Sequence, residues 1–183
     1  MQQDMVIKNG VLKRYLGDCR NVVVPEGVKE IAEGAFENCD SIVNVVLPEG
    51  LEVIGVSAFE CCYNLEYVEV PNSVKVLGHH AFVECEKLLR IELPDQIEEI
   101  DDFTFCECHS LKNVKLPNRL KRIGEYAFCA CVYLTSITIP ESVKLIDDGA
   151  FSGCDFLQDV YIMSSETDIC ETAFADCDNV NII

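Results

Sequence analysis

Twelve cysteines are the most reactive side chains of this 183-residue chain. Seven of them recur every 23 residues, at positions 39, 62, 85, 108, 131, 154 and 177. If equivalent positions stack, each thiol lies about 5 Å from the next. Every thiol in such a column has two equivalent neighbours, so the spacing favours no particular disulfide pairing. Because free cysteine behaves as a small, readily buried apolar side chain, the spacing predicts a column of reduced thiols in the core. Such a column fits a reducing compartment but does not require one.

Two further cysteines, Cys106 and Cys129, are also one period apart, each two residues before a member of that column. They are predicted to be neighbours. They could be two free thiols, a disulfide or a soft-metal site. Zinc-binding cysteines are usually separated by two to four residues, and this spacing is absent here, because Cys106 and Cys129 are each separated by one residue from the next cysteine. Cys19, Cys61 and Cys170 have no partner evident from the sequence.

Four carboxylates form a second periodic column, at Asp102, Glu125, Asp148 and Glu171. Like charges about 5 Å apart repel one another, and a hard cation such as Ca²⁺ would relieve that repulsion. Flexible side chains that splay into water would relieve it equally well. The repeat also lacks the Gly-Asp pattern of calcium-binding solenoids.

The histidines, His79, His80 and His109, belong to no catalytic pattern. Neither a serine nucleophile elbow, an HExxH helix nor a glycine-rich phosphate loop is present in the sequence. We therefore expect no enzyme activity, no catalytic residues and no cofactor or resident metal.

The elements that position these residues follow from the same period. Every proline is 23 residues from the next, from Pro25 to Pro140, and phenylalanine keeps this period from Phe36 to Phe174. A period of about 20 to 29 residues with alternating apolar positions is typical of a leucine-rich-repeat array. We expect an α/β repeat fold, a right-handed solenoid with a parallel sheet, short strands and short helical or 3₁₀ turns.

The unit at residues 68–90 shows how each repeat is expected to fold. Val68 and Val70 alternate with Glu69, which predicts a short strand with Glu69 pointing outward. Pro71 ends that strand, and Val74 and Leu77 return to the core. Apolar spacing from Phe82 onward then favours a short helical or 3₁₀ turn.

The two ends of the array differ. The apolar alternation around Asn9-Gly10 predicts a β-hairpin, so we assign residues 1–21 to a hairpin cap and residues 22–183 to about seven 23-residue repeats. The last repeat is degenerate, with Met163 in place of proline and Glu166 in place of an apolar residue. Residues 180–183 begin another strand, so either the chain continues or another copy covers this edge as a homo-oligomer.

The formal charge of −18 disfavours nucleic acid and anionic membranes as partners, and a basic or neutral protein fits better. Acidity that merely keeps the array soluble is the simpler explanation of the charge. No apolar run approaches the roughly 18 residues of a membrane span, and residues 1–4 lack a secretory signal. We expect a cytoplasmic protein as the sequence stands, or a cell-surface or secreted one if an N-terminal segment has been removed.

The recurring offsets of Pro, Ala-Phe and Cys, with the Asn-Gly-Val-Leu hairpin ahead of them, resemble the BspA-like (Treponema pallidum type) leucine-rich repeats. The resemblance spans about residues 5 to 183, with Thr104 in place of alanine as one departure. It implies a bacterial or protist protein, often surface-exposed and host-adhesive. It transfers no functional residue.

Recognition in such an array is expected on the variable outward positions of the sheet. Two such columns are Asn44, Tyr67, Arg90, Asn113, Ser136, Asp159 and Val46, Glu69, Glu92, Lys115, Thr138, Tyr161. The candidate partner-binding residues are Tyr67, Glu69, Arg90, Glu92, Lys115 and Tyr161. We predict a non-enzymatic scaffold that binds a macromolecule, most simply a protein. The alternatives are an ordinary solvated face and a structural module that assembles through its C-terminal edge.

Overall fold

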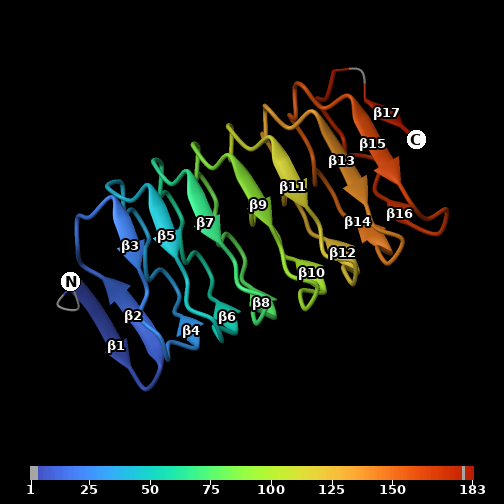
Figure 1. Cartoon of the computed structure of the whole chain (residues 1–183). Coiled ribbons are helices and arrows are strands. Elements are labelled where there is room, and N and C mark those ends of the chain that lie inside the picture. The colour runs from blue at the N-terminus through green and yellow to red at the C-terminus, as the bar shows by residue number, and fades with distance from the viewer. Residues whose placement is uncertain (1–3, 179) are drawn as a thin grey trace.

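The computed structural model describes residues 4–178 and 180–183, which form one continuous stack of coils (Figure 1). One row of strands faces the viewer in Figure 1 and consists of β3 Asn21–Val23, β5 Asn44–Val46, β7 Tyr67–Glu69, β9 Arg90–Glu92, β11 Asn113–Lys115, β13 Ser136–Ile139, β15 Asp159–Ile162 and β17 Asn181–Ile182. A second row of shorter strands consists of β4 Glu30–Ile31, β6 Val53–Ile54, β8 Val76–Leu77, β10 Glu99–Ile100, β12 Arg122–Ile123, β14 Leu145–Ile146 and β16 Asp168–Ile169. We call these the long row and the short row.

The strands of each row are parallel and offset by one repeat, which confirms the predicted solenoid. In the long row Asn44 pairs with Tyr67, and in the short row Ile31 pairs with Ile54. Only one strand per repeat was predicted from the sequence, so the short row was not expected. A strand of two residues shows no alternation of period 2, so its only sequence signal is one buried residue per coil.

Alternation along each long strand separates the core from the surface. In β7 Val68 is buried between exposed Tyr67 and Glu69, and Val74 and Leu77 are buried beyond Pro71, as predicted. The same inward positions are buried from coil to coil. Each coil therefore covers the apolar surface of its neighbour, which it could not bury alone.

Phenylalanine and cysteine form two columns through the centre of the stack. The rings of Phe36, Phe59, Phe82, Phe105, Phe128, Phe151 and Phe174 stack with centroids 4.9 to 5.5 Å apart. The periodic thiols from Cys62 to Cys177 donate hydrogen bonds of 3.0 to 3.3 Å to the phenylalanine carbonyls one coil earlier. The predicted core column is confirmed from Cys62 to Cys154, whereas its end members Cys39 and Cys177 are half-buried. Each thiol from Cys62 to Cys177 also ties two coils together.

The predicted helical or 3₁₀ turns are instead isolated turns, and no helix occurs between residues 5 and 178. The hydrogen bonds of successive backbone amides explain why no helix forms. Ala81, Val83 and Cys85 donate within their own coil, three residues back, whereas Phe82 and Glu84 donate to Thr104 and Cys106 in the next coil. Because every second N–H is used between coils, no helical ladder can propagate.

The described residues contain no helix long and apolar enough to cross a membrane.

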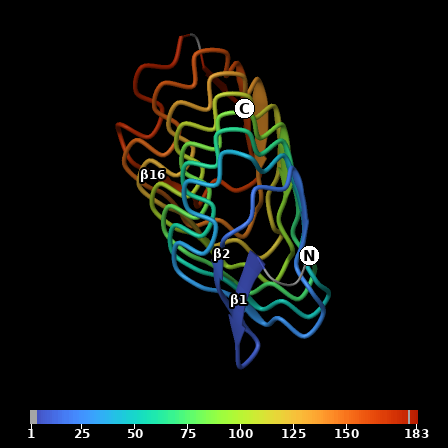
Figure 2. The same ribbon diagram turned by 90° about the vertical axis from the view of Figure 1, so that its left-hand side faces the viewer.

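The N-terminal hairpin is present, with β1 Met5–Lys8 antiparallel to β2 Val11–Tyr15. Asn9 and Gly10 both have positive φ, 53° and 73°, as a tight hairpin turn of type I′ requires. β2 is also the parallel neighbour of β4, so the hairpin continues the short row and covers the first coil (Figure 2). Residues 1–3 of the predicted cap lie outside the described residues.

At the other end, β17 pairs with β15 and extends the long row by one more strand. Ile182 and Ile183 are 53% and 56% exposed there. Ile169 and Phe174 are partly exposed, whereas their equivalents in the preceding coil, Ile146 and Phe151, are fully buried. The core is therefore less covered in the last coil than in the middle of the stack.

Candidate interaction face

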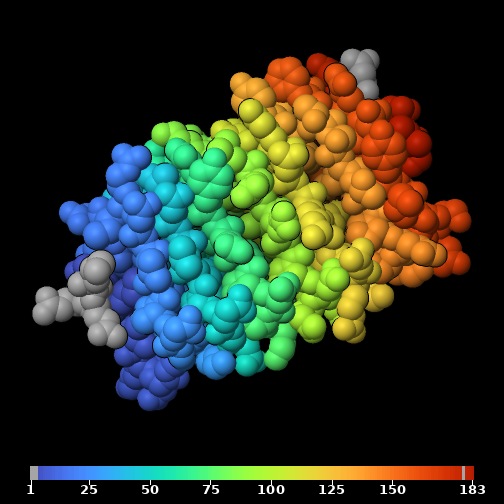
Figure 3. Space-filling view, in the orientation of Figure 1, coloured from blue at the N-terminus to red at the C-terminus, as the bar shows by residue number. Residues whose placement is uncertain are grey.

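The outward side of the long row carries the residues predicted to bind a partner. Tyr67, Glu69, Arg90, Glu92, Lys115 and Tyr161 are all exposed. Figure 3 shows the molecule from this side. The strand register confirms the two predicted columns wherever neighbouring strands pair, since Asn113 lies opposite Arg90 and Thr138 opposite Tyr161. We call this surface the long-row face; the binding role of its residues stays a prediction.

The structure brings four of these six side chains together in two pairs. The guanidinium carbon of Arg90 lies 6.0 Å from the centre of the Tyr67 ring, a cation–π contact between adjacent coils. Lys115 Nζ lies 3.6 Å from a carboxylate oxygen of Glu92. Tyr161 is three repeats beyond the coil of Arg90 and lies apart from both pairs.

A groove of about 1460 Å³ runs beside these pairs, where β9, β11 and β13 pass into the turns that lead to the short row. Its walls include exposed strand positions such as Arg90 and Ser136 and turn residues such as Asn118 and Ser165. Five basic side chains line it: Arg90, Lys112, Lys115, Lys121 and Lys144. An open groove of this size accommodates an extended segment of another molecule.

Lys121 and Lys144 were not predicted as groove residues. Their column begins with alternating charges, Lys29, Glu52, Lys75, Glu98 and Lys121, a pattern that indicates ion pairs between adjacent coils. One such pair is present, between Lys75 and Glu52 at 2.9 Å. Hydrogen bonding to Lys75 lowers the pKa of Glu52. The alternation stops at Lys121 and Lys144, and that break was the available signal.

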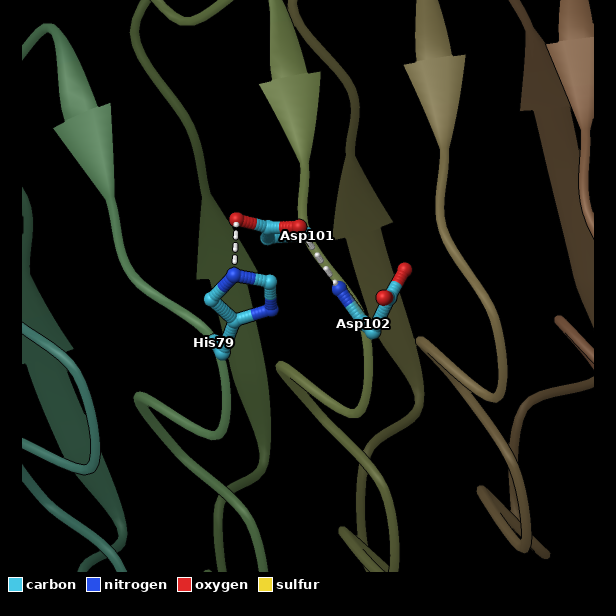
Figure 4. A group of neighbouring side chains, drawn as sticks. All are labelled: His79, Asp101 and Asp102. Atoms are coloured by element: carbon cyan, nitrogen blue, oxygen red, sulfur yellow. Dashed lines mark hydrogen bonds and ion pairs between the residues drawn. The ribbon is translucent and has the colours of Figure 1, made fainter.

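Arg122 lies between carboxylates of neighbouring coils and contacts one member of the predicted acidic column, Asp102. Its Nη2 is 2.8 Å from carboxylate oxygens of both Asp102 and Asp147, and its Nη1 is 3.6 Å from Asp101. Asp101 also lies 3.1 Å from His79 Nε2 and accepts a hydrogen bond from the amide of Asp102 (Figure 4). The guanidinium thus neutralises charge at Asp102 and its neighbours Asp101 and Asp147, but it reaches only one of the four carboxylates of the column.

The pKa of Asp102 reflects this arrangement. Burial alone would raise the pKa, but the hydrogen bond from the Glu125 amide and the Arg122 guanidinium outweigh burial and lower it. Glu125 and Glu171, the other expected members of the column, are exposed, and Asp148 accepts a 2.8 Å hydrogen bond from the Thr172 hydroxyl. Asp102 and Asp148 therefore link adjacent coils through hydrogen bonds and, for Asp102, an ion pair.

The repeat motif decides the family. Residues 7–105 and 76–183 match the model of the BspA type leucine-rich repeat region, with six copies. This chain belongs to the BspA-type leucine-rich repeat family. The resemblance inferred from the Pro, Ala-Phe and Cys offsets is confirmed. No protein of curated function matches the chain.

Several solved structures share the fold. A T. pallidum leucine-rich repeat protein is 35% identical with a TM-score of 0.78, over 94% of this chain and 77% of that one. A repeat protein from Eubacterium ventriosum is 25% identical with a TM-score of 0.66, over 80% and 46% of the two chains. The pneumococcal vaccine antigen PcpA is 24% identical with a TM-score of 0.64, over 96% and 39%, and shows the fold alone.

Within this BspA-type array the Cys106 and Cys129 thiols are neighbours, as predicted from their spacing. Both are free. A hydrogen bond between the two thiols raises the pKa of Cys106 and lowers that of Cys129. Cys106 is buried and Cys129 is half-buried, so the pair lies at the edge of the core.

Proposed function

We propose that this BspA-type protein is a non-enzymatic scaffold that binds another protein through its long-row face. Proteins of this repeat family generally act as interaction or adhesion scaffolds. The observation that supports the proposal here is the Arg90–Tyr67 contact beside the groove. Arginine and tyrosine are favoured at the centres of protein interfaces, and an aromatic ring that holds a guanidinium lowers the entropy lost on binding.

Site-specific photo-crosslinking in an extract of the source organism tests this proposal. A photoreactive phenylalanine analogue replaces Tyr67 or Tyr161 on the long-row face, or Tyr126 in a turn elsewhere as the matched control. Tyr67, Tyr161 and Tyr126 expose 42%, 40% and 39% of their surface, so exposure alone does not favour the long-row face. We expect protein adducts from positions 67 and 161 only. Adducts of equal yield from all three positions would contradict the proposal.

A second candidate function is assembly through β17. This strand pairs with β15, and its exposed Ile182 and the following Ile183 offer apolar surface. Strand edges with exposed apolar side chains favour pairing with another chain. The association state of the protein in solution separates this candidate from a partner-binding scaffold.

A further inference from the structure

The groove on the long-row face is positively charged on a strongly acidic protein. Five of the 14 Lys and Arg side chains line it beside three of the 32 Asp and Glu side chains, namely Glu92, Glu141 and Glu166. Its formal charge is therefore +2, whereas the other nine cations and 29 anions give the remainder of the chain a charge of −20. Such a separation of charge indicates what kind of ligand the groove favours.

Two of the five cations are already engaged by carboxylates of the groove. Lys115 lies 3.6 Å from Glu92, and Lys144 lies 2.9 Å from Glu166. Both of these pairs are largely exposed, so each contributes little and can exchange for a ligand carboxylate.

The other three cations are Arg90, Lys112 and Lys121, and none forms an ion pair within residues 4–178 and 180–183. Arg90 lies over the Tyr67 ring, and Lys112 lies 5.8 Å from the centre of the Tyr133 ring. All three are exposed and line the same groove. They are free to bind carboxylates from outside.

The extent of the groove sets the length of its ligand. Its walls come from four successive coils, which span about 15 Å at the usual spacing of neighbouring strands. An extended peptide of about five residues covers that distance. Neutral polar side chains lie between the cations and can bind the peptide backbone: Asn113, Asn118, Ser136, Thr138, Ser142, Ser164 and Ser165.

A long polyanion fits less well than such a short segment. Nucleic acid would leave the groove at both ends and pass over a surface whose net charge is negative. At physiological ionic strength charges are screened beyond about 8 Å, so a short peptide in the groove interacts mainly with the lysines and Arg90.

We propose that this groove binds a short Asp- or Glu-rich segment of a protein partner. This inference rests on the proposed function and specifies the chemistry of the partner.

Fluorescence anisotropy with a labelled six-residue glutamate-rich peptide tests it, with the glutamine version of the same peptide as the ligand control. The first protein variant carries Lys112→Gln and Lys121→Gln. The control variant carries Lys8→Gln and Lys13→Gln on the distant hairpin and has the same net charge. We expect the groove variant to bind the acidic peptide about fivefold more weakly than the wild type, and the hairpin variant to bind it unchanged. Binding should also weaken as salt is raised.

Three results would overturn the inference: no binding of the acidic peptide, equal binding of the glutamine peptide, or equal weakening by both variants. Displacement of the peptide by RNA at a lower concentration than by unlabelled acidic peptide would also contradict it. The photo-crosslinks from positions 67 and 161 distinguish the two proposals. If these persist while the acidic peptide fails to bind, the long-row face still binds a protein but the acidic specificity is wrong.

Discussion

The Cys108 thiol donates a 3.2 Å hydrogen bond to the main-chain carbonyl of Phe82, one coil earlier in the stack. The thiol is fully buried, so it contributes both packing and a link between coils. Replacing it by alanine removes the sulfur and leaves a small cavity. We expect Cys108→Ala to lower the free energy of unfolding by about 1 to 2 kcal/mol.

Urea denaturation measures this change, and Cys19→Ala is the matched control because Cys19 is exposed. The control should shift the free energy of unfolding by no more than about 0.5 kcal/mol. Equal midpoints for Cys108→Ala and the wild type would mean that the cysteine column does not stabilise the stack.

The buried thiols should be protected from modification in the folded protein. Burial raises the pKa of Cys85, Cys108 and Cys131, which disfavours the reactive thiolate and also excludes the reagent. With a disulfide reagent at pH 8 we expect exposed Cys19 to react quickly and these three to react only after unfolding. Mass spectrometry after timed labelling identifies each thiol.

All twelve cysteines should react in denaturant if none is oxidised. A total of ten would reveal one disulfide, with Cys106 and Cys129 as the first pair to examine because their thiols are neighbours. Rapid labelling of Cys108 in the folded protein would contradict the buried column.

Arg122→Gln should destabilise the stack in a pH-dependent way. The substitution leaves Asp101, Asp102 and Asp147 close together without their shared cation, and we expect a loss of about 1 to 3 kcal/mol at pH 7. The pKa of Asp102 is lowered in the folded protein, so this carboxylate stabilises the fold above its unfolded pKa of about 3.9 and less as the pH falls through the folded pKa. The difference from wild type should therefore shrink below about pH 4.

Urea denaturation at several pH values between 7 and 3 provides the measurement, and Arg20→Gln is the control because Arg20 is exposed. A deficit for Arg122→Gln that is the same at pH 7 and pH 3 would show that the arginine acts by packing alone.

Association through β17 should depend on its apolar side chains. Ile182→Lys combined with Ile183→Lys places charge on the exposed edge, which disfavours pairing with another chain. If the wild type assembles, light scattering over a concentration series should show growth that this variant abolishes. A wild type that stays monomeric at all concentrations would contradict assembly, and growth that the variant retains would show a different interface.

Much of the fold was predictable because stacking repeats one contact every 23 residues. The inward columns, the phenylalanine and cysteine columns, the hairpin and the outward positions from Tyr67 to Tyr161 all follow from that offset. The prediction of helical turns was wrong. Apolar spacing around Phe82 is compatible with a helix, but the Phe82 amide donates to Thr104 of the next coil, and no pattern within one repeat reveals that bond.

The candidate site was predictable only in part. Net charge favoured a basic or neutral partner, yet the groove gathers Lys112, Lys121 and Lys144 on one surface of this acidic chain. Lys121 and Lys144 share a column, whereas Lys112 belongs to another. Net charge sums the charged residues and does not say where they lie. Which of them line the groove depends on how each coil bends between its two strands.

The 23-residue period alone predicts which side chains stack on their own equivalents, because neighbouring coils are related by a translation of one repeat. Which columns contact one another depends instead on the three-dimensional fold. Arg122 contacts Asp102 and Asp147, which are 20 and 25 residues away, so neither contact has the offset of the repeat. Contacts of this kind depend on the cross-section of the coil, and that shape is set by the turns and by the amides that bond from one coil to the next.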